Sequence, residues 1–435
     1  MSLIELGDVS SEPDGGPHRV TEFRHGTVRR LVLVALVVLC VATLGASARP
    51  APPLVRELWS VPISDPDLLA VHDGVVLVHR LTDARAEVTG YDAVTGRVRW
   101  TRLVGQHSAG LETVERAGVL LLPGEQETDS GTMTAVDAAT GATLWHRPGA
   151  YHLAVEPEAT LLAAPGPEGS GTMLRLVRTR DGGTIWERAA PNTAESLQVQ
   201  ADGTGPARVV IATASGEVTL LDYATGTPLL VRRLPWSATE AETGDGSSVT
   251  TSDGLLMVTR TRGIAHTITA YRIGTLERLW SANAPTYLWA QGCGPVVCLT
   301  SDDGTIVAVD PDTGARRWSR SGFPMTGLVP GDVSLLVMTN DQDPRPMLID
   351  AATGEPRGPA SHGWVAYGDR AAGFAVLIES TVTAGARSGV IRFDLTTGRS
   401  TPLGTVELIG NNRCTGSGGL LLCQTGGRLA VNRLG

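Results

Sequence analysis

One short segment recurs along the chain at a nearly constant spacing. Its clearest copy is Ala308–Trp318 (AVDPDTGARRW), and two others are Gly90–Trp100 (GYDAVTGRVRW) and Ala135–Trp145 (AVDAATGATLW). Weaker copies follow about every 40 to 48 residues. A period in this range is typical of solenoids, propellers and repeat arrays. The chain is therefore restricted to an architecture built from one repeated unit.

Each position of the segment has a physical role. The residues before Asp310 (TIVAV, 305–309) predict a half-buried strand. Asp310 ends this strand, and its short carboxylate can accept backbone N–H groups of the following turn. Gly314 allows the positive φ of a tight hairpin. Trp318 lies on the return strand, where its ring can fill the gap between neighbouring sheets. The unit is therefore predicted to be a hairpin with a packing anchor.

The segment resembles the repeat of the pyrroloquinoline-quinone-type β-propellers, which reads approximately Ala-x-Asp-x-x-Thr-Gly-x-x-x-Trp. The resemblance covers about Leu58 to the C-terminus and implies an all-β propeller of four-stranded blades. The family includes quinoprotein dehydrogenases and also proteins without a quinone, among them the lipoprotein scaffold of the outer-membrane assembly machine. The resemblance is therefore specific for the fold and not for an activity.

The repeat count and the family differ over the number of blades. Eight turn units are present, and their turns lie near Gly96, Gly141, Gly182, Gly226, Thr275, Gly314, Gly354 and Gly398. A further unit can form from the N-terminal strand at Glu57–Ser60 together with two C-terminal strands, 419–423 and 428–431. Such pairing of the two ends would close the ring and remove its exposed edges. The literal count is nine, whereas the family implies eight.

Several units depart from the motif. Arginine replaces the turn Asp at Arg178 and Arg272, Leu276 replaces a turn Gly, and the Trp position holds Leu230, Gly358 or Pro402. Repeat arrays tolerate such variation because each unit contacts only its neighbours. The longest divergent connections are the candidate binding loops, and they span residues 124–131, 165–171 and 235–248.

The tryptophans fall into two groups. Six occupy the repeat position and are predicted to pack between blades: Trp59, Trp100, Trp145, Trp186, Trp280 and Trp318. Trp236, Trp289 and Trp364 lie off that position and are the aromatic residues to examine for surface exposure.

The N-terminal region predicts a membrane anchor. Residues 1–30 read as a disordered cytoplasmic tail, 31–48 as a transmembrane signal anchor, 49–57 as a proline-rich linker and 58–435 as the propeller. Arginines precede the apolar segment, which orients the N-terminus to the cytoplasm and the propeller to the outside. Ala46–Ala48 also fits a signal-peptidase site, so a cleaved signal peptide is the alternative.

Four cysteines follow the predicted anchor: Cys293, Cys298, Cys414 and Cys423. An even number in an exported domain favours disulfides. Three connectivities are possible, and we prefer Cys293 with Cys298 and Cys414 with Cys423, because both pairs then join the first two strands of a blade. A zinc site is the weaker alternative, since the spacings do not match zinc-finger patterns.

No catalytic, cofactor-binding or metal-binding residue can be nominated. The resemblance implies that a quinoprotein dehydrogenase needs a catalytic carboxylate and a calcium ion held by Glu and Asn side chains, with adjacent cysteines in several cases, and no adjacent cysteines occur here. Asp302-Asp303 and Asp341-Gln342-Asp343 lack a calcium-loop spacing. The turn aspartates read as turn caps. A net charge of −9 provides no basic surface for nucleic acid.

These observations predict a single-pass cell-membrane protein whose extracytoplasmic β-propeller is a non-catalytic scaffold. We expect a monomeric ectodomain that binds a polypeptide or another envelope component and carries no cofactor. A dehydrogenase of sugars or alcohols that uses pyrroloquinoline quinone and calcium is the alternative from another class. A sensor ectodomain is the third hypothesis, although the short tail carries no output domain of its own.

Overall fold

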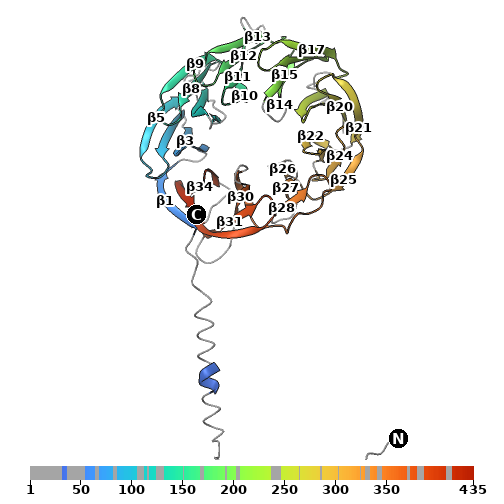
Figure 1. Ribbon diagram of the computed structural model, residues 1–435. Helices are drawn as coiled ribbons and strands as arrows, with labels where there is room; N and C mark the ends of the chain where they lie inside the picture. Colours follow the sequence, from blue (N-terminus) through green and yellow to red (C-terminus); the bar gives the residue numbers. More distant parts are fainter. Residues whose placement is uncertain are drawn as a thin grey trace, which may run out of the picture. The chain divides into compact units, whose positions relative to one another are not determined.

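The chain divides into two units, Met1–Pro52 and Pro53–Gly435. The computed structural model describes residues 32–36 and most of residues 54–435 (Figure 1); the gaps are 64–67, 82–85, 105–111, 115–116, 124–131, 150, 167–170, 192–193, 202–205, 237–245, 264, 285–286, 302, 324, 329–333, 340–344, 370–372, 380–386 and 408–413.

The described part of the first unit, residues 32–36, is helical. The predicted tail and most of the predicted anchor lie outside the described residues. Within the part that is described, no helix is long and apolar enough to cross a membrane.

The described part of the second unit consists of nine antiparallel sheets, which we name A to I. Sheets B, C and D contain β2 (Leu68–His72), β3 (Val75–Leu81), β4 (Ala86–Asp92) and β5 (Val98–Val104); β6 (Glu112–Val114), β7 (Val119–Pro123), β8 (Thr132–Asp137) and β9 (Thr143–Pro148); and β10 (Tyr151–Val155), β11 (Ala159–Pro165), β12 (Thr172–Arg178) and β13 (Thr184–Ala189).

Sheets E, F and G contain β14 (Ala194–Ala201), β15 (Pro206–Thr213), β16 (Glu217–Asp222) and β17 (Pro228–Arg233); β18 (Gly246–Ser252), β19 (Leu255–Arg262), β20 (Ala265–Arg272) and β21 (Glu277–Ala284); and β22 (Tyr287–Cys293), β23 (Val296–Ser301), β24 (Ile306–Val309) and β25 (Arg316–Arg320).

Sheets H, I and A contain β26 (Met325–Leu328), β27 (Ser334–Met338) and β28 (Pro346–Asp350); β29 (Trp364–Asp369), β30 (Phe374–Glu379), β31 (Arg387–Asp394) and β32 (Ser400–Glu407); and β33 (Cys414–Ser417), β34 (Leu420–Thr425), β35 (Arg428–Leu434) and β1 (Val55–Pro62). The all-β fold of four-stranded sheets is therefore as predicted, with one exception in sheet H.

The sheets follow one another around a common centre (Figure 1). In sheets B to G and in sheet I, the strands are ordered as they occur in the chain, and the last strand of each sheet lies at the periphery. Nine hydrophobic clusters fill the contacts, and each contains buried residues of two successive sheets. A fully buried Val or Leu contributes about 1.5–3 kcal/mol relative to the exposed side chain. The stability of the unit is therefore distributed over many similar interfaces.

Sheet A joins the two ends of the second unit. Strand β1 pairs with β35, and Trp59 lies opposite Val431 in this ladder. The N–H of Gly435 donates to the carbonyl of Leu54 at 2.6 Å. Strand β1 begins at Val55, inside the predicted linker, because its hydrogen-bonded register extends from Val55 to Pro62. The strand predicted around Trp59 therefore lies beside the C-terminal strand.

The nine sheets agree with the literal repeat count and differ from the eight blades that the family implies. The divergent fifth unit is a complete four-stranded sheet, F. Sheet H has three described strands. After β28 the chain reads EPRGP (355–359), and only an isolated bridge joins Ile349 to Pro356. Proline has no N–H to donate to a ladder, which explains why a fourth strand does not form there.

Both preferred disulfides are present, Cys293–Cys298 in sheet G and Cys414–Cys423 in sheet A. Each joins the first and second strands of its sheet, and Cys414 lies directly opposite Cys423 in the ladder. The predicted connectivity is confirmed.

Candidate functional site

The turn aspartates accept hydrogen bonds within their own hairpins, and Asp310 shows the arrangement most completely. Oδ1 of Asp310 accepts hydrogen bonds from the backbone N–H and the hydroxyl of Thr313, both at 2.9 Å. Oδ2 accepts a hydrogen bond from the Arg317 guanidinium at 2.5 Å. The bond from Arg317, followed by those from Thr313, lowers the pKa of Asp310 to about 2. This carboxylate is therefore ionised and committed to the turn.

The same arrangement recurs along the chain. The Thr three residues after the Asp donates both its N–H and its hydroxyl to the carboxylate at Asp92, Asp137, Asp222, Asp310, Asp350 and Asp394. The interpretation of these residues as turn caps is confirmed.

An Asp310→Asn variant is expected to unfold at a lower urea concentration than the unchanged protein near neutral pH, with a smaller difference in acid. The pKa of Asp310 in the folded state, about 2, lies below its ordinary value of 3.8. The carboxylate therefore stabilises the folded state above about pH 4, and this contribution is lost as the pH falls toward about 2. Urea midpoints at several pH values measure it. Glu217→Gln, on an exposed side chain of β16, is the control, and a difference independent of pH would contradict the prediction.

The repeat-position tryptophans pack onto the turn of the next sheet. The Trp318 ring lies against Gly354, and its indole N–H donates to the carbonyl of Ala351 at 2.9 Å. A Cβ at Gly354 would lie 2.7 Å from this ring, and the residue has a φ of +73°. Only glycine satisfies both conditions. The ring thus links two sheets through packing and one hydrogen bond.

All six predicted tryptophans form this contact. The pairs of ring and glycine are Trp59 with Gly96, Trp100 with Gly141, Trp145 with Gly182, Trp186 with Gly226, Trp280 with Gly314 and Trp318 with Gly354. Every indole N–H donates to a backbone carbonyl of the neighbouring turn, at 2.7–3.1 Å. The predicted packing role is confirmed.

The departures from the motif occur in matched pairs. Leu230 holds the Trp position of sheet E, and Leu276 holds the turn Gly position of sheet F; both belong to the cluster between these sheets. Gly358, at the Trp position of the seventh unit, lies against Gly398 of the next turn. A Cβ on Gly358 would lie 2.9 Å from the carbonyl oxygen of Thr397, so no side chain fits there. At Leu276 the turn thus holds a residue other than glycine, and the position facing it is Leu230 instead of a tryptophan.

The off-position aromatics and predicted loops contribute little to a site. Trp236 is buried, and Trp364 is half-buried against the cluster between sheets I and A. The side chain of Trp289 lies outside the described residues, as do Asp302, Asp341, Asp343, residues 124–131 and most of the other two predicted loops. Asp303 accepts hydrogen bonds from Ser301 and Thr305 within its own turn.

Three apolar side chains are exposed on two successive outermost strands. Ile185 of β13 is 45% exposed, and Leu229 and Val231 of β17 are 54% and 53% exposed. Strands β13 and β17 are neighbours at the periphery (Figure 1). We call these three residues the D–E surface. On the corresponding strand of sheet G, β25, the exposed residues are instead Arg316, Arg317 and Ser319.

The sequence analysis did not identify the D–E surface, although a signal was present. Ile185 precedes Trp186, and Leu229 and Val231 flank Leu230. Neighbours along a strand point to opposite faces. Because the residue at the Trp position points into the interface, an apolar residue beside it points to solvent.

The described residues do not fit the cofactor that the family resemblance implies. No three His, Cys, Asp or Glu side chains among them converge on a point where they could hold a metal ion. All four described cysteines are consumed in the two disulfides. The turn carboxylates accept hydrogen bonds from Thr, and those of Asp92, Asp310 and Asp350 also from Arg. No step through a quinone or calcium can therefore be derived from this set.

A family model described as outer membrane protein assembly factor BamB matches residues 56–207 and 170–401. No curated protein sequence matches the chain.

Three solved structures are similar in fold. BamB from Moraxella catarrhalis is 17% identical, covering 87% of this chain and 99% of that chain at a TM-score of 0.42. The dihydro-heme d1 dehydrogenase NirN in complex with DHE is 17% identical, and the match covers 82% of this chain and 83% of that chain at a TM-score of 0.46. The quinohemoprotein alcohol dehydrogenase ADHIIG from Pseudomonas putida HK5 is 14% identical, and the match covers 66% of this chain and 72% of that chain at a TM-score of 0.35. At these values they carry no argument about activity.

Proposed function

The chain belongs to the family of the outer membrane protein assembly factor BamB, and from this premise we propose that it is a scaffold that binds another protein and catalyses no reaction. The family is described by a role in assembling other proteins, which requires binding surfaces. The engaged turn carboxylates support the absence of catalysis. The observation that carries the proposal is the D–E surface.

The D–E surface combines two features of a peptide-binding edge. Strand β17 is the last strand of sheet E, so one side of its backbone pairs with β16 and the other is free of a described strand. An extended polypeptide can add to such an edge through backbone hydrogen bonds, with side-chain contacts giving selectivity. Leu229 and Val231 expose about half of their surfaces there. Contiguous exposed apolar residues mark interaction sites in soluble domains. The proposed partner is therefore an extended, apolar segment of a polypeptide.

We further propose that the nine sheets form a closed ring outside the cytoplasm, anchored by residues 31–48. The pairing of β1 with β35 and the two disulfides support this proposal, because disulfides persist in oxidising compartments. The helical residues Val32, Leu33, Val34 and Leu36 are apolar and more than half exposed, as expected for a segment that contacts lipid.

Replacing Leu229 and Val231 together by arginine is expected to lower partner binding at least about tenfold, which corresponds to about 1.4 kcal/mol. A proximity-labelling enzyme at the C-terminus of the full chain identifies neighbouring proteins in the native cell. We expect extracytoplasmic proteins to be labelled, and the double variant to lose at least one of them. Ser319→Arg on β25 is the control, because it places a charge of the same sign on the equivalent strand of sheet G. Leu229, Val231 and Ser319 are all exposed, and their replacement is expected to leave the free energy of unfolding unchanged.

Two outcomes would contradict the proposed function. Labelling of cytoplasmic proteins alone would place the second unit on the wrong side of the membrane, and identical labelling by the double variant would remove the D–E surface from the binding role. An absorption change after incubation with pyrroloquinoline quinone and calcium, together with reduction of a dye by a sugar or an alcohol, would instead support a dehydrogenase.

A further inference from the structure

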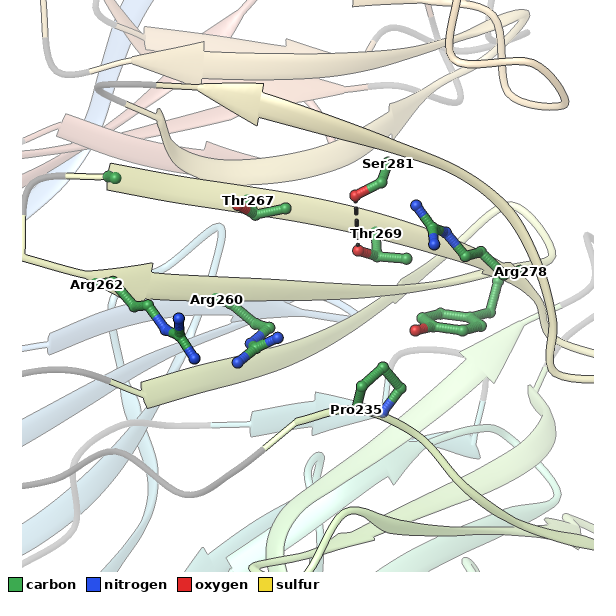
Figure 2. A pocket seen from close by; sticks show the side chains of 9 residues that line it. Pro235, Arg260, Arg262, Thr267, Thr269, Arg278 and Ser281 are labelled. Carbon is green, nitrogen blue, oxygen red and sulfur yellow. Dashed lines mark hydrogen bonds between the residues drawn. The ribbon is translucent and has the colours of Figure 1, made fainter.

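A cavity of about 310 Å³ lies on sheet F beside Pro235, which follows the last strand of sheet E. Its charged lining consists of three arginines, Arg260, Arg262 and Arg278. Figure 2 shows Arg260 and Arg262 next to each other on one side of the pocket and Arg278 beside Thr269 on the other. No acidic residue is among the described residues that line the cavity.

The register of sheet F brings these residues together. Arg260 of β19 lies opposite Thr267 of β20, and Arg278 of β21 lies opposite Tyr271 of β20. A register shift between Ala270 and Tyr271 produces the second pairing. Alternate residues of a strand share one face, so the three arginines lie on the same face of the sheet.

The remaining lining supplies hydrogen-bonding groups. The hydroxyls of Thr269 and Ser281 bond to each other at 3.0 Å across the ladder (Figure 2). Thr267 adds a third hydroxyl, and Tyr271 a phenol. Burial raises the pKa of Tyr271, with a smaller opposing influence from Arg278 and Arg260, so its phenol keeps its proton and can donate a hydrogen bond. The pocket therefore presents positive charge together with several donors.

Sheet B has an arginine and a tyrosine at the equivalent positions, and there an acidic residue pairs with the arginine. Arg80 and Tyr91 have the same spacing as Arg260 and Tyr271, and Arg80 lies opposite Glu87 in the ladder. The Arg80 guanidinium forms an ion pair with Glu87 at 3.8 Å, and it donates to the carbonyl of Pro62 at 3.0 Å.

Sheet F lacks this compensation. Thr267 replaces the glutamate, Arg278 takes the place of Val98, and Arg262 adds a third cation. None of the three arginines forms an ion pair with a described residue, although the chain as a whole carries a net charge of −9. Grouping like charges without counter-ions is unfavourable. A bound anion would remove this cost.

We propose that this pocket binds the phosphoryl group of a small phosphorylated molecule, held by the guanidinium groups of Arg260, Arg262 and Arg278. Arginine presents a planar fork of donors that matches phosphate oxygens bidentately. A volume of about 310 Å³ suits a small ligand. Three cations around one cavity match a dianion with several oxygens better than a single carboxylate of an acidic peptide. This ligand site is separate from the D–E surface.

Calorimetric titration of the full-length protein in detergent tests the proposal with three probes: inorganic phosphate, glucose 6-phosphate and mixed detergent micelles containing phosphatidylglycerol. The first two represent soluble sources of the phosphoryl group, and the third a lipid headgroup. We expect saturable binding of at least one probe. Thr267→Glu places a carboxylate where sheet B has Glu87, and it is expected to weaken binding at least about tenfold. Arg262→Gln, at an exposed residue, is also expected to weaken binding at least about tenfold. This variant tests the proposal if Thr267→Glu fails to fold.

Ser319→Glu on β25 is the control, since it adds the same charge on sheet G at a residue that does not line the cavity, and it should change affinity by less than about twofold. Binding that is equal in the unchanged protein, Thr267→Glu and Arg262→Gln would overturn the proposal, as would the absence of binding by all three probes. Binding of a polyglutamate peptide that depends on Thr267, without binding of any phosphate probe, would assign the pocket to acidic polypeptides instead.

Discussion

Trp318→Ala is expected to lower the free energy of unfolding by about 3–5 kcal/mol. The Trp318 side chain is 8% exposed and belongs to the cluster between sheets G and H. Its removal leaves a cavity at this interface and breaks the hydrogen bond to the carbonyl of Ala351. Denaturation in urea measures the loss. Leu230→Ala is the matched control, because Leu230 holds the same repeat position with a smaller, half-buried side chain, and we expect a smaller loss there.

A double-mutant cycle tests whether the Trp318 ring and Gly354 depend on each other. Gly354→Ala alone is expected to destabilise strongly, because its Cβ would lie 2.7 Å from the Trp318 ring. In the Trp318→Ala background this clash disappears, and only the strain of a positive φ remains, which costs about 1–2 kcal/mol. The two effects should therefore differ by about 1–3 kcal/mol from additivity. Additive losses would show that the ring and the glycine are independent.

The sequence predicted those features that depend on chemistry within one unit. Asp310, Thr313 and Gly314 form their turn through contacts among neighbours in the chain, and the same letters recur with the same outcome at Asp92 and Asp350. The anchor role of Trp318 followed from its size and its place on the return strand. Local chemistry repeated at a fixed spacing is therefore sufficient for the fold.

Features that depend on register were not accessible in this way. The pocket of sheet F exists because Arg260 and Arg278, from different strands, meet on one face, and the shift after Ala270 sets that pairing. The sequence shows arginines at 260, 262 and 278 but not their common face. The D–E surface similarly requires β13 and β17 to be neighbouring outermost strands. The repeat motif and the family gave different blade numbers, and the described residues form nine sheets, of which sheet A combines strands from both ends of the second unit.

Deletion of residues 53–62 is expected to cost about 5 kcal/mol or more of the free energy of unfolding, since it removes β1 with Val55, Leu58 and Trp59 from two clusters at about 1.5–3 kcal/mol per buried side chain. A loss of this size is comparable with the whole stability of many domains. The deletion also exposes Leu429 and Val431 of β35, which are fully buried in the complete chain. We expect a lower thermal unfolding temperature and aggregation through the uncovered edge.

A synthetic peptide with the sequence of residues 54–63 should restore the unfolding temperature of the shortened protein, because it can refill the ladder beside β35. The same peptide with Trp59→Ala should bind at least about tenfold more weakly. The reason is that the Trp59 indole donates to the carbonyl of Ala93 at 2.9 Å and covers Gly96 of the next sheet. If the shortened protein is as stable as the complete one, the strand contributes nothing to joining the ends. If both peptides restore the unfolding temperature equally, backbone pairing alone holds β1 beside β35. The contact of Trp59 with sheet B then contributes nothing to joining the two ends.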